Sequence, residues 1–173
     1  MKKYKFEDST PEYPETAFIA PDARLIGSVR IGENSSIWFK SVLRGDVEQI
    51  NIGNETNFQD LSIGHADPGF PLFIGDRVTV GHRCVTHGCK IDDDCLIGMG
   101  AILMNGVKIG RGSIVGAGAV VLEGTNVPPF SMIAGSPAKI IKTYEESILE
   151  NIRSMSKHYV KIAERYLEKI NEL

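Results

Sequence analysis

The sequence predicts an all-β solenoid followed by one C-terminal α-helix, and a repeat of six residues carries this prediction. From Ile19 onward an aliphatic or similar residue recurs at every sixth position, with three interruptions, and glycine often follows it. A small or branched residue comes four positions after each of these. A period of six fits neither an α-helix nor a long alternating strand. It fits a coil of short strands and turns, with aliphatic side chains inside and glycines at the bends.

Repeats of this kind resemble the hexapeptide repeats of the left-handed parallel β-helix, a triangular prism with three repeats in each coil. The left hand is implied by the resemblance and not by the period, because crossover connections are usually right-handed. We expect the prism to span residues 17–137, after an irregular, polar lead-in over residues 1–16. A capping-box pattern from Thr143 predicts a helix over residues 143–173, whose apolar stripe packs on the prism or on a neighbouring subunit.

The composition limits the classes of function. The net charge of −3 argues against a nucleic-acid-binding protein, which would carry a basic patch. No segment approaches the roughly 20 apolar residues of a membrane span, and the N-terminus lacks the apolar run of a signal peptide. An odd number of cysteines, without paired metal-ligand spacing, favours a reducing compartment. We therefore expect a cytoplasmic protein that binds neither nucleic acid nor membrane.

The interruptions of the repeat gather along one edge of the predicted prism. When the repeats are assigned in turn to three sides, every interruption follows the third side. The loops 46–51 and 66–73 then emerge together at one edge. Loops on a rigid scaffold often carry binding and catalytic residues, so we expect a functional edge there.

Three of the four histidines lie at positions that the repeat relates to one another. His65 and His87 share one outward position of the third side in adjacent coils, and strands about 4.8 Å apart let two imidazoles share a metal ion. His82 ends the second side, at the position that Asp60 takes one coil earlier. A full side, roughly 16 Å at ~3.3 Å per residue, separates His82 from His87.

One chain therefore cannot bring these three histidines to one ion. If all three are ligands, His82 comes from another subunit in a head-to-tail contact, which closes naturally as a trimer. Three neutral histidines with one open position are also the donor set of a hydrolytic or hydrating zinc centre. The fourth histidine, His158, is expected to be an ordinary residue of the helix surface. Cys84 and Cys95 take small inward positions, and Cys89 follows a candidate ligand without being expected to bind metal.

Several motifs lie around these histidines. They are L-R-G-D at 43–46, N-x-Q-D at 57–60, His65, V-G-H-x-x-x-x-H-G at 80–88, M-G-x-x-x-x-N-G at 99–106 and G-S-P-A-K at 135–139. Together they closely resemble the γ-class carbonic anhydrase family over most of the chain. The three-histidine set is specific, whereas the repeats and G-S-P-A-K also occur in hexapeptide acyltransferases.

The resemblance implies a homotrimer that hydrates carbon dioxide reversibly to bicarbonate by a metal-bound hydroxide. It implies zinc at each interface, or iron or cobalt in some members, held by His65 and His87 of one subunit and His82 of the next. Gln59 would orient the hydroxide, and Asn105 would donate to a substrate oxygen.

The resemblance also implies a set of charged hydrogen bonds across the interface, which would order the groups around the ligands. An alternative for the first two residues of this set is an ion pair that only locks the subunits together. The residues concerned are Arg44, Asp46 and Asp60.

Two departures from the family pattern concern proton transfer. The founding member carries a glutamate where this chain has Val47, and a glutamate-bearing loop where this chain has the short segment 66–73, whose one acid is Asp67. We therefore expect slow hydration, or a different small electrophile as substrate. Tyr159 matches a tyrosine that a shorter-loop branch of the family places near the site, where it either orients substrate or water or only packs.

Two other functions remain open. One is an acyl-CoA-dependent acyltransferase on the same fold with a histidine as general base, although this does not explain the stacked pair and the offset third histidine. The other is a non-catalytic binding subunit in which the metal only stabilises the trimer.

Overall fold

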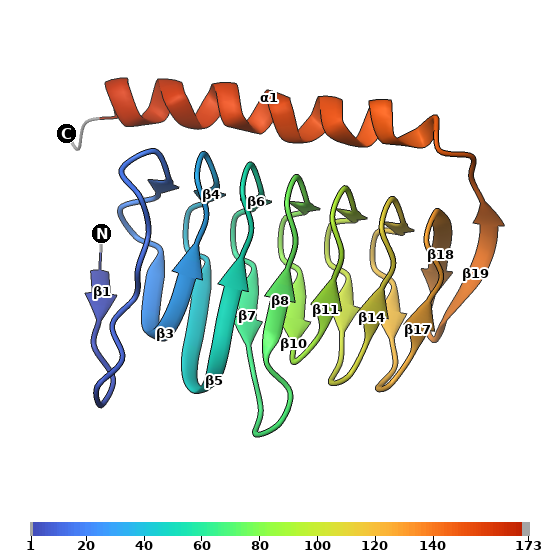
Figure 1. The fold of residues 1–173 in the computed structure, drawn as a ribbon, viewed down its shortest axis with the longest axis horizontal. Coiled ribbons are helices and arrows are strands. Elements are labelled where there is room, and N and C mark those ends of the chain that lie inside the picture. The colour runs from blue at the N-terminus through green and yellow to red at the C-terminus, as the bar shows by residue number, and fades with distance from the viewer. Residues whose placement is uncertain (1, 171–173) are drawn as a thin grey trace.

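The computed structural model describes residues 2–170 and forms a left-handed parallel β-helix with one long helix along its side (Figure 1). This confirms the predicted fold class. Each coil contributes one short strand to each of three sides, and equivalent strands of successive coils pair in parallel. Within these residues, no helix is both long and apolar enough to cross a membrane.

The second side is a sheet of its own, which ends in an antiparallel strand. Its strands are β2 (Phe18–Ile19), β4 (Ser36–Ile37), β6 (Asn57–Phe58), β9 (Thr79–Val80), β12 (Leu96–Ile97), β15 (Ile114–Val115), β18 (Ser131–Gly135) and β19 (Ala138–Thr143).

The third and first sides are joined into one larger sheet because two long strands run around their shared corner. These two are β3 (Arg24–Ile31) and β5 (Val42–Ile52). The third side continues with β7 (Ile63–His65), β10 (Val85–His87), β13 (Ile102–Leu103) and β16 (Val120–Val121). The first side continues with β8 (Leu72–Ile74), β11 (Lys90–Ile91), β14 (Lys108–Ile109) and β17 (Asn126–Val127).

The repeat itself explains the core. The aliphatic positions are buried, as at Leu43, and the small polar residues that follow bond to the next coil. Ser41 Oγ donates to the Gln59 carbonyl at 2.8 Å, and Ser62 Oγ donates to the Gly81 carbonyl at 3.0 Å. These bonds satisfy hydroxyls that would otherwise be buried without a partner.

One inward position is a glycine for steric reasons. At Gly64, a Cβ atom would lie 2.6 Å from Leu43 Cδ2 and 3.0 Å from Leu72 Cδ2, closer than carbon atoms pack. The aliphatic side chains of neighbouring repeats fill this space, so Gly64 keeps the strand that leads into His65 close to the core.

The ends of the β-helix differ from the expected boundaries. β1 (Lys2–Tyr4) lies within the stretch expected to be irregular and pairs in parallel with β3, which covers an otherwise open sheet edge. At the other end, Thr143 belongs to β19, so α1 (Ile148–Lys169) begins later than the capping-box pattern predicts. Residues 171–173, which we expected to continue the helix, lie outside the described residues.

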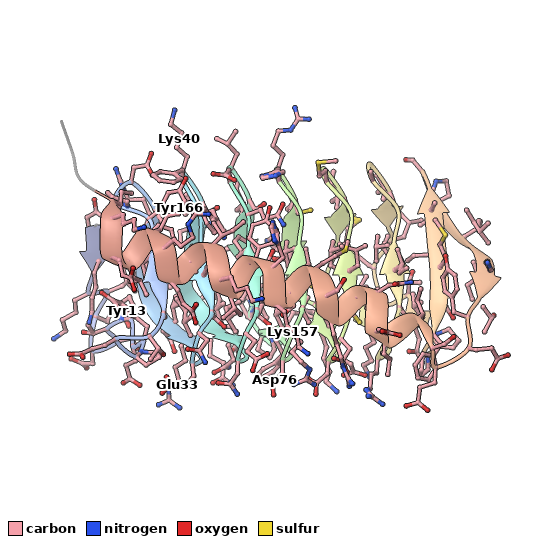
Figure 2. The ribbon with its side chains drawn as sticks, turned by 90° about the horizontal axis from the view of Figure 1, so that it is seen from above. Tyr13, Glu33, Lys40, Asp76, Lys157 and Tyr166 are labelled. Atoms are coloured by element: carbon pink, nitrogen blue, oxygen red, sulfur yellow. The ribbon has the colours of Figure 1, made fainter. Side chains whose placement is uncertain are left out.

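α1 lies over the second side and runs back from β19 toward the first coil (Figures 1 and 2). Three kinds of contact hold it there. Arg153 forms hydrogen bonds with Asp94 at 2.8 and 3.0 Å, and the buried Ser156 Oγ donates to the Glu55 carbonyl at 2.6 Å. Tyr166 also packs edge-on against Trp38, 5.1 Å between ring centroids.

Candidate metal centre

The strand register brings His65 and His87 side by side. His87 of β10 pairs directly with His65 of β7, and Arg44 of β5 pairs with His65 on its other side. The two imidazole centroids lie 4.9 Å apart. This is the column that the repeat period predicts. It ends at the edge where the loop 66–73 leaves the prism, whereas residues 46–51, which we expected to form a second loop, continue around the corner as part of β5.

Each imidazole directs one nitrogen at the other ring and one nitrogen at an outer oxygen. His65 Nδ1 lies 2.9 Å from His87 Nε2. His65 Nε2 lies 3.2 Å from Asp46 Oδ1, and His87 Nδ1 lies 2.8 Å from Asn105 Oδ1. Asn105 Nδ2 donates to Asp67 Oδ2 at 2.9 Å, which turns the amide oxygen of Asn105 toward His87.

This pattern fixes where the protons of the two rings lie. The Asp46 carboxylate and the Asn105 amide oxygen only accept, so the outer ring nitrogens must both carry hydrogen. In neutral imidazoles the inner nitrogens of His65 and His87 are then both lone pairs, facing each other at 2.9 Å. Such a pair repels unless a cation lies between them. Ligand imidazoles in proteins are oriented in this way by outer carboxylates and carbonyls, so the donor set fits a metal ion.

Asp46 is an ionised carboxylate. Burial acts to raise its pKa, but hydrogen bonds from Arg44, from its own backbone amide and from His65 outweigh this effect and hold the pKa of Asp46 below its usual value. Arg44 bonds one carboxylate oxygen and His65 lies on the other. Arg44 therefore holds the group that orients His65.

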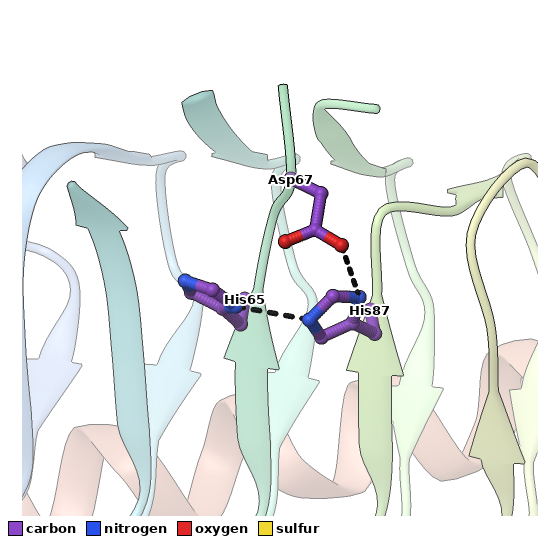
Figure 3. Close-up of side chains that lie close together, drawn as sticks. All are labelled: His65, Asp67 and His87. Carbon is purple, nitrogen blue, oxygen red and sulfur yellow. Dashed lines mark hydrogen bonds and ion pairs between the residues drawn. The ribbon is translucent and has the colours of Figure 1, made fainter. Parts of the chain in front are cut away.

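Asp67 is a third potential donor, which the sequence reasoning treated only as the remaining acid of a short loop. One atom from each of His65, Asp67 and His87 falls within 4.8 Å of the others (Figure 3). A signal existed in the sequence, because Asp67 lies two residues after His65 and side chains two apart on an extended chain point to the same face.

Gly88 makes room for this arrangement. It follows His87 directly, with a φ of 53°, in the left-handed region that favours glycine. A Cβ atom there would overlap Asn105 Oδ1 and would lie 2.8 Å from Phe70 Cβ. The absence of a side chain thus lets the Asn105 amide and the loop 66–73 approach His87.

His82 lies apart from the pair. Among residues 2–170, the cluster of metal-type donors at the edge holds His65, Asp67 and His87 but not His82. His82 Nδ1 lies 2.8 Å from Asp60 Oδ2, and 41% of its side chain is exposed. Asp60 thus orients the His82 ring as Asp46 orients the His65 ring. The second ring nitrogen of His82, Nε2, takes no part in the contact with Asp60.

His82 lines a groove of about 550 Å³ between the second side and α1, together with Gln59, His158 and Tyr159. Gln59 Nε2 donates to Asn57 Oδ1 at 2.9 Å. Asn57 Nδ2 in turn donates to Thr79 Oγ1 at 2.9 Å, and all three side chains are buried. This chain fixes the amide orientation and leaves Gln59 Oε1 as an acceptor.

Tyr159 is a neutral phenol. Burial and, secondarily, the charge of Asp60 raise its pKa above the ordinary tyrosine value. Its ring also packs edge-on against Trp38, 5.5 Å between centroids. Tyr159 thus packs against the core and lines the groove at once.

The cysteines are buried thiols. Burial raises the pKa of Cys84 to about 11 and the pKa values of Cys89 and Cys95 to about 12. Metal binding and nucleophilic attack both require the thiolate. These residues therefore belong to the core, as expected for Cys84 and Cys95.

Two family models match the chain, the bacterial transferase hexapeptide (six repeats) over residues 88–123 and the hexapeptide repeat of succinyl-transferase over residues 71–104. A Methanocaldococcus jannaschii protein named as a probable carbonic anhydrase is 49% identical, over 84% of this chain and 92% of its own length. The mitochondrial γ carbonic anhydrase 2 of Arabidopsis thaliana is 39% identical, over 91% of this chain and 59% of its own length.

A solved structure from Bacillus cereus, described provisionally as an acetyltransferase, has a TM-score of 0.94 at 38% identity. The match covers 96% of this chain and 97% of the chain in the solved structure. The chain belongs to the γ-class carbonic anhydrase family of hexapeptide-repeat proteins.

Proposed function

We propose that this protein is a metal-dependent lyase that hydrates carbon dioxide reversibly to bicarbonate at a site between subunits. The single observation that carries the proposal is the histidine pair, in which both outer nitrogens are held by acceptors and both inner nitrogens are free for a cation. The names of the relatives support this reaction in particular.

Zinc suits this donor set, because tetrahedral zinc accepts imidazole nitrogen, and Fe²⁺ or Co²⁺ are alternatives with the same ligand preference. Zinc would supply a water with a pKa near ~7, a value established for carbonic anhydrases in general, to attack carbon dioxide at neutral pH.

The third ligand in this proposal is His82 of the partner subunit. His82 has the same local design as His65, with one ring nitrogen on a carboxylate and the other free. One chain keeps His82 away from the pair, so a head-to-tail contact must supply it. Three such contacts close a homotrimer with three equivalent sites.

The outward faces of the prism support this contact. The outward column of the third side is aliphatic, with 45% of Ile63 and 38% of Ile102 exposed in the single chain. The same column contains Val42, Ile63, Val85, Ile102 and Val120. The matching column of the first side is mostly polar, with Arg30, Asn51, Phe73, Lys90, Lys108 and Asn126. Contiguous exposed apolar surface of this kind favours a protein interface.

The other residues then take distinct roles. Gln59 Oε1 accepts a hydrogen bond from the attacking water and orients it, while the Tyr159 hydroxyl donates to a substrate oxygen. Asp46 and Asp60 orient ligand rings. Asn105 holds His87 through its amide oxygen, so we now assign it to ring orientation rather than to direct contact with substrate.

An acyltransferase is a second candidate because the Bacillus cereus relative carries that description. Such an enzyme needs no metal and takes an acyl-CoA. A non-catalytic trimer would bind metal without hydration activity. Metal removal separates both alternatives from the proposal. An acyltransferase would stay active without metal, and a non-catalytic trimer would have no hydration activity to lose.

Stopped-flow hydration of carbon dioxide by anaerobically purified, zinc- or iron-loaded protein tests the proposal. We expect activity in the loaded protein and none after chelation. Gln59→Ala should retain trimer and metal and lose most of the rate. Acetyl transfer by the metal-free protein, or a Gln59→Ala rate equal to that of the wild type, would contradict the proposal.

A further inference from the structure

The reaction proposed above creates a proton-transfer requirement, and the inference drawn from it rests on that proposed function. Carbon dioxide and water give bicarbonate and one proton, so each turnover needs a group that takes this proton and delivers it to buffer. The acceptor works best when its pKa lies near the operating pH. At the histidine-pair edge Val47 cannot accept a proton, the Asp67 carboxylate accepts a hydrogen bond from Asn105, and the Glu48 carboxylate accepts one from the Gly69 amide.

The groove beside His82 offers few acceptors. Its titratable lining residues are His82, His158 and Tyr159. His82 is engaged by Asp60 and is assigned to the metal. Tyr159 remains a protonated phenol, since burial and then the charge of Asp60 raise its pKa. His158 is the remaining group, and histidine is the side chain whose ordinary pKa lies between pH 5 and 8.

His158 also lies at the right place for exchange with solvent. It is exposed, yet it lines the same groove as Gln59 and His82. Its ring stands perpendicular to that of Tyr159, at 6.1 Å between centroids. On α1 the charged residues flanking it are Lys157, which precedes it, and Lys161, which lies one turn further on.

The helix turn that bears His158 is firmly placed. Arg153 is bonded to Asp94, and Ser156 is bonded to the Glu55 carbonyl, both within the turn and a half before His158. These contacts hold the part of α1 that bears His158 beside the groove.

We propose that His158 is the proton-transfer residue of this enzyme. A bare imidazole nitrogen takes the proton released in the groove, and the imidazolium then gives a proton to buffer, which returns the neutral ring. One proton enters and one leaves in each turnover, and no other co-reactant is needed.

His158→Gln tests this, because glutamine keeps a polar side chain that does not titrate. In zinc-loaded protein at low buffer concentration we expect kcat to fall about tenfold or more, with kcat/KM unchanged. Imidazole buffer should restore kcat. The matched control is Lys157→Gln, which changes the adjacent residue and should leave kcat as in the wild type.

A second readout is independent of activity. Zinc titration of the metal-free proteins supplies it, because His158 is not a ligand in this proposal and His158→Gln should therefore bind as much zinc as the wild type. An unchanged kcat at low buffer concentration, or loss of zinc from His158→Gln, overturns the inference. If the loaded wild type shows no hydration at all, the proposed function fails, and the inference fails with it.

Discussion

The Asp94 cluster and the His65–His87 pair are two sets of ionisable side chains on the β-helix, and they differ in whether the chain itself supplies all the partners that their charges and lone pairs need. The Asp94 side chain is 0% exposed and receives hydrogen bonds from Arg153, Arg77 and Arg111, all in its own chain. Burial would raise the pKa of Asp94, but these three arginines outweigh burial and hold it far below the usual value.

The histidine pair lacks such internal compensation. Its outer nitrogens are satisfied by Asp46 and Asn105, while its inner nitrogens face each other without a cation from the same chain. The closed set is the Asp94 cluster, in which the charges compensate one another within the chain. It stabilises the β-helix and holds α1 against it. The open set is the histidine pair, where we propose that a metal ion binds. The predictions below separate these two kinds of cluster.

The largest effect is expected at the open set. His87→Gln removes one of the paired ligands, so zinc content should fall from about one ion per chain to near zero, and hydration with it. The fold should survive, with metal-free stability within about 1 kcal/mol of the wild type, since the substitution alters one half-buried hydrogen bond, that between His87 and Asn105. Metal analysis and urea unfolding measure both. Retention of stoichiometric zinc would show that the pair is not the binding site.

The closed set should behave in the opposite way. Asp94→Asn leaves three arginines without their carboxylate and should cost about 3 kcal/mol of unfolding free energy, the low end for breaking a buried ion pair because the arginines are partly exposed. Zinc binding should persist in the folded fraction. Asp92→Asn, which removes the exposed partner of Lys90, is the control and should cost under about 0.5 kcal/mol. Equal losses in the two variants would refute the distinction.

A smaller effect is expected where an outer group supports the open set. Asp46→Asn keeps the shape but removes the charge that orients His65, and zinc affinity should fall about 10- to 100-fold. Competition with a zinc chelator measures this directly. An affinity equal to that of the wild type would mean that Arg44 and Asp46 only lock the subunits.

The smallest effect concerns pH. Because the pKa of folded Asp94 is lowered, its contribution to stability is fully present above the unfolded value and is lost as the pH falls. Protonation of this residue in the unfolded chain should cost about 1 kcal/mol by pH 3. Urea unfolding at pH 3 and pH 7 should show a smaller decrease for Asp94→Asn than for the wild type. A larger decrease in the variant would contradict this assignment.

The sequence predicted those features that follow from the six-residue period. The stacking of His65 on His87 and the separation of His82 both follow from strand register, which the period determines. The contacts of Asp67 and Asn105 do not follow from the strand register. The loop 66–73 breaks the repeat, and its path depends on Phe70 packing beside Gly88. The Arg153–Asp94 contact was also missed, since no repeat relates a position on α1 to a corner of the prism.

The most direct test of the central claim is a mixing experiment with two inactive variants. Chains carrying His82→Ala and chains carrying His87→Ala are unfolded, mixed in equal amounts and refolded, and zinc content and hydration are measured. If each site takes its pair from one subunit and His82 from the next, about one site in four should be restored by random assembly of trimers. No recovery of zinc or activity in verified mixed trimers would contradict the account.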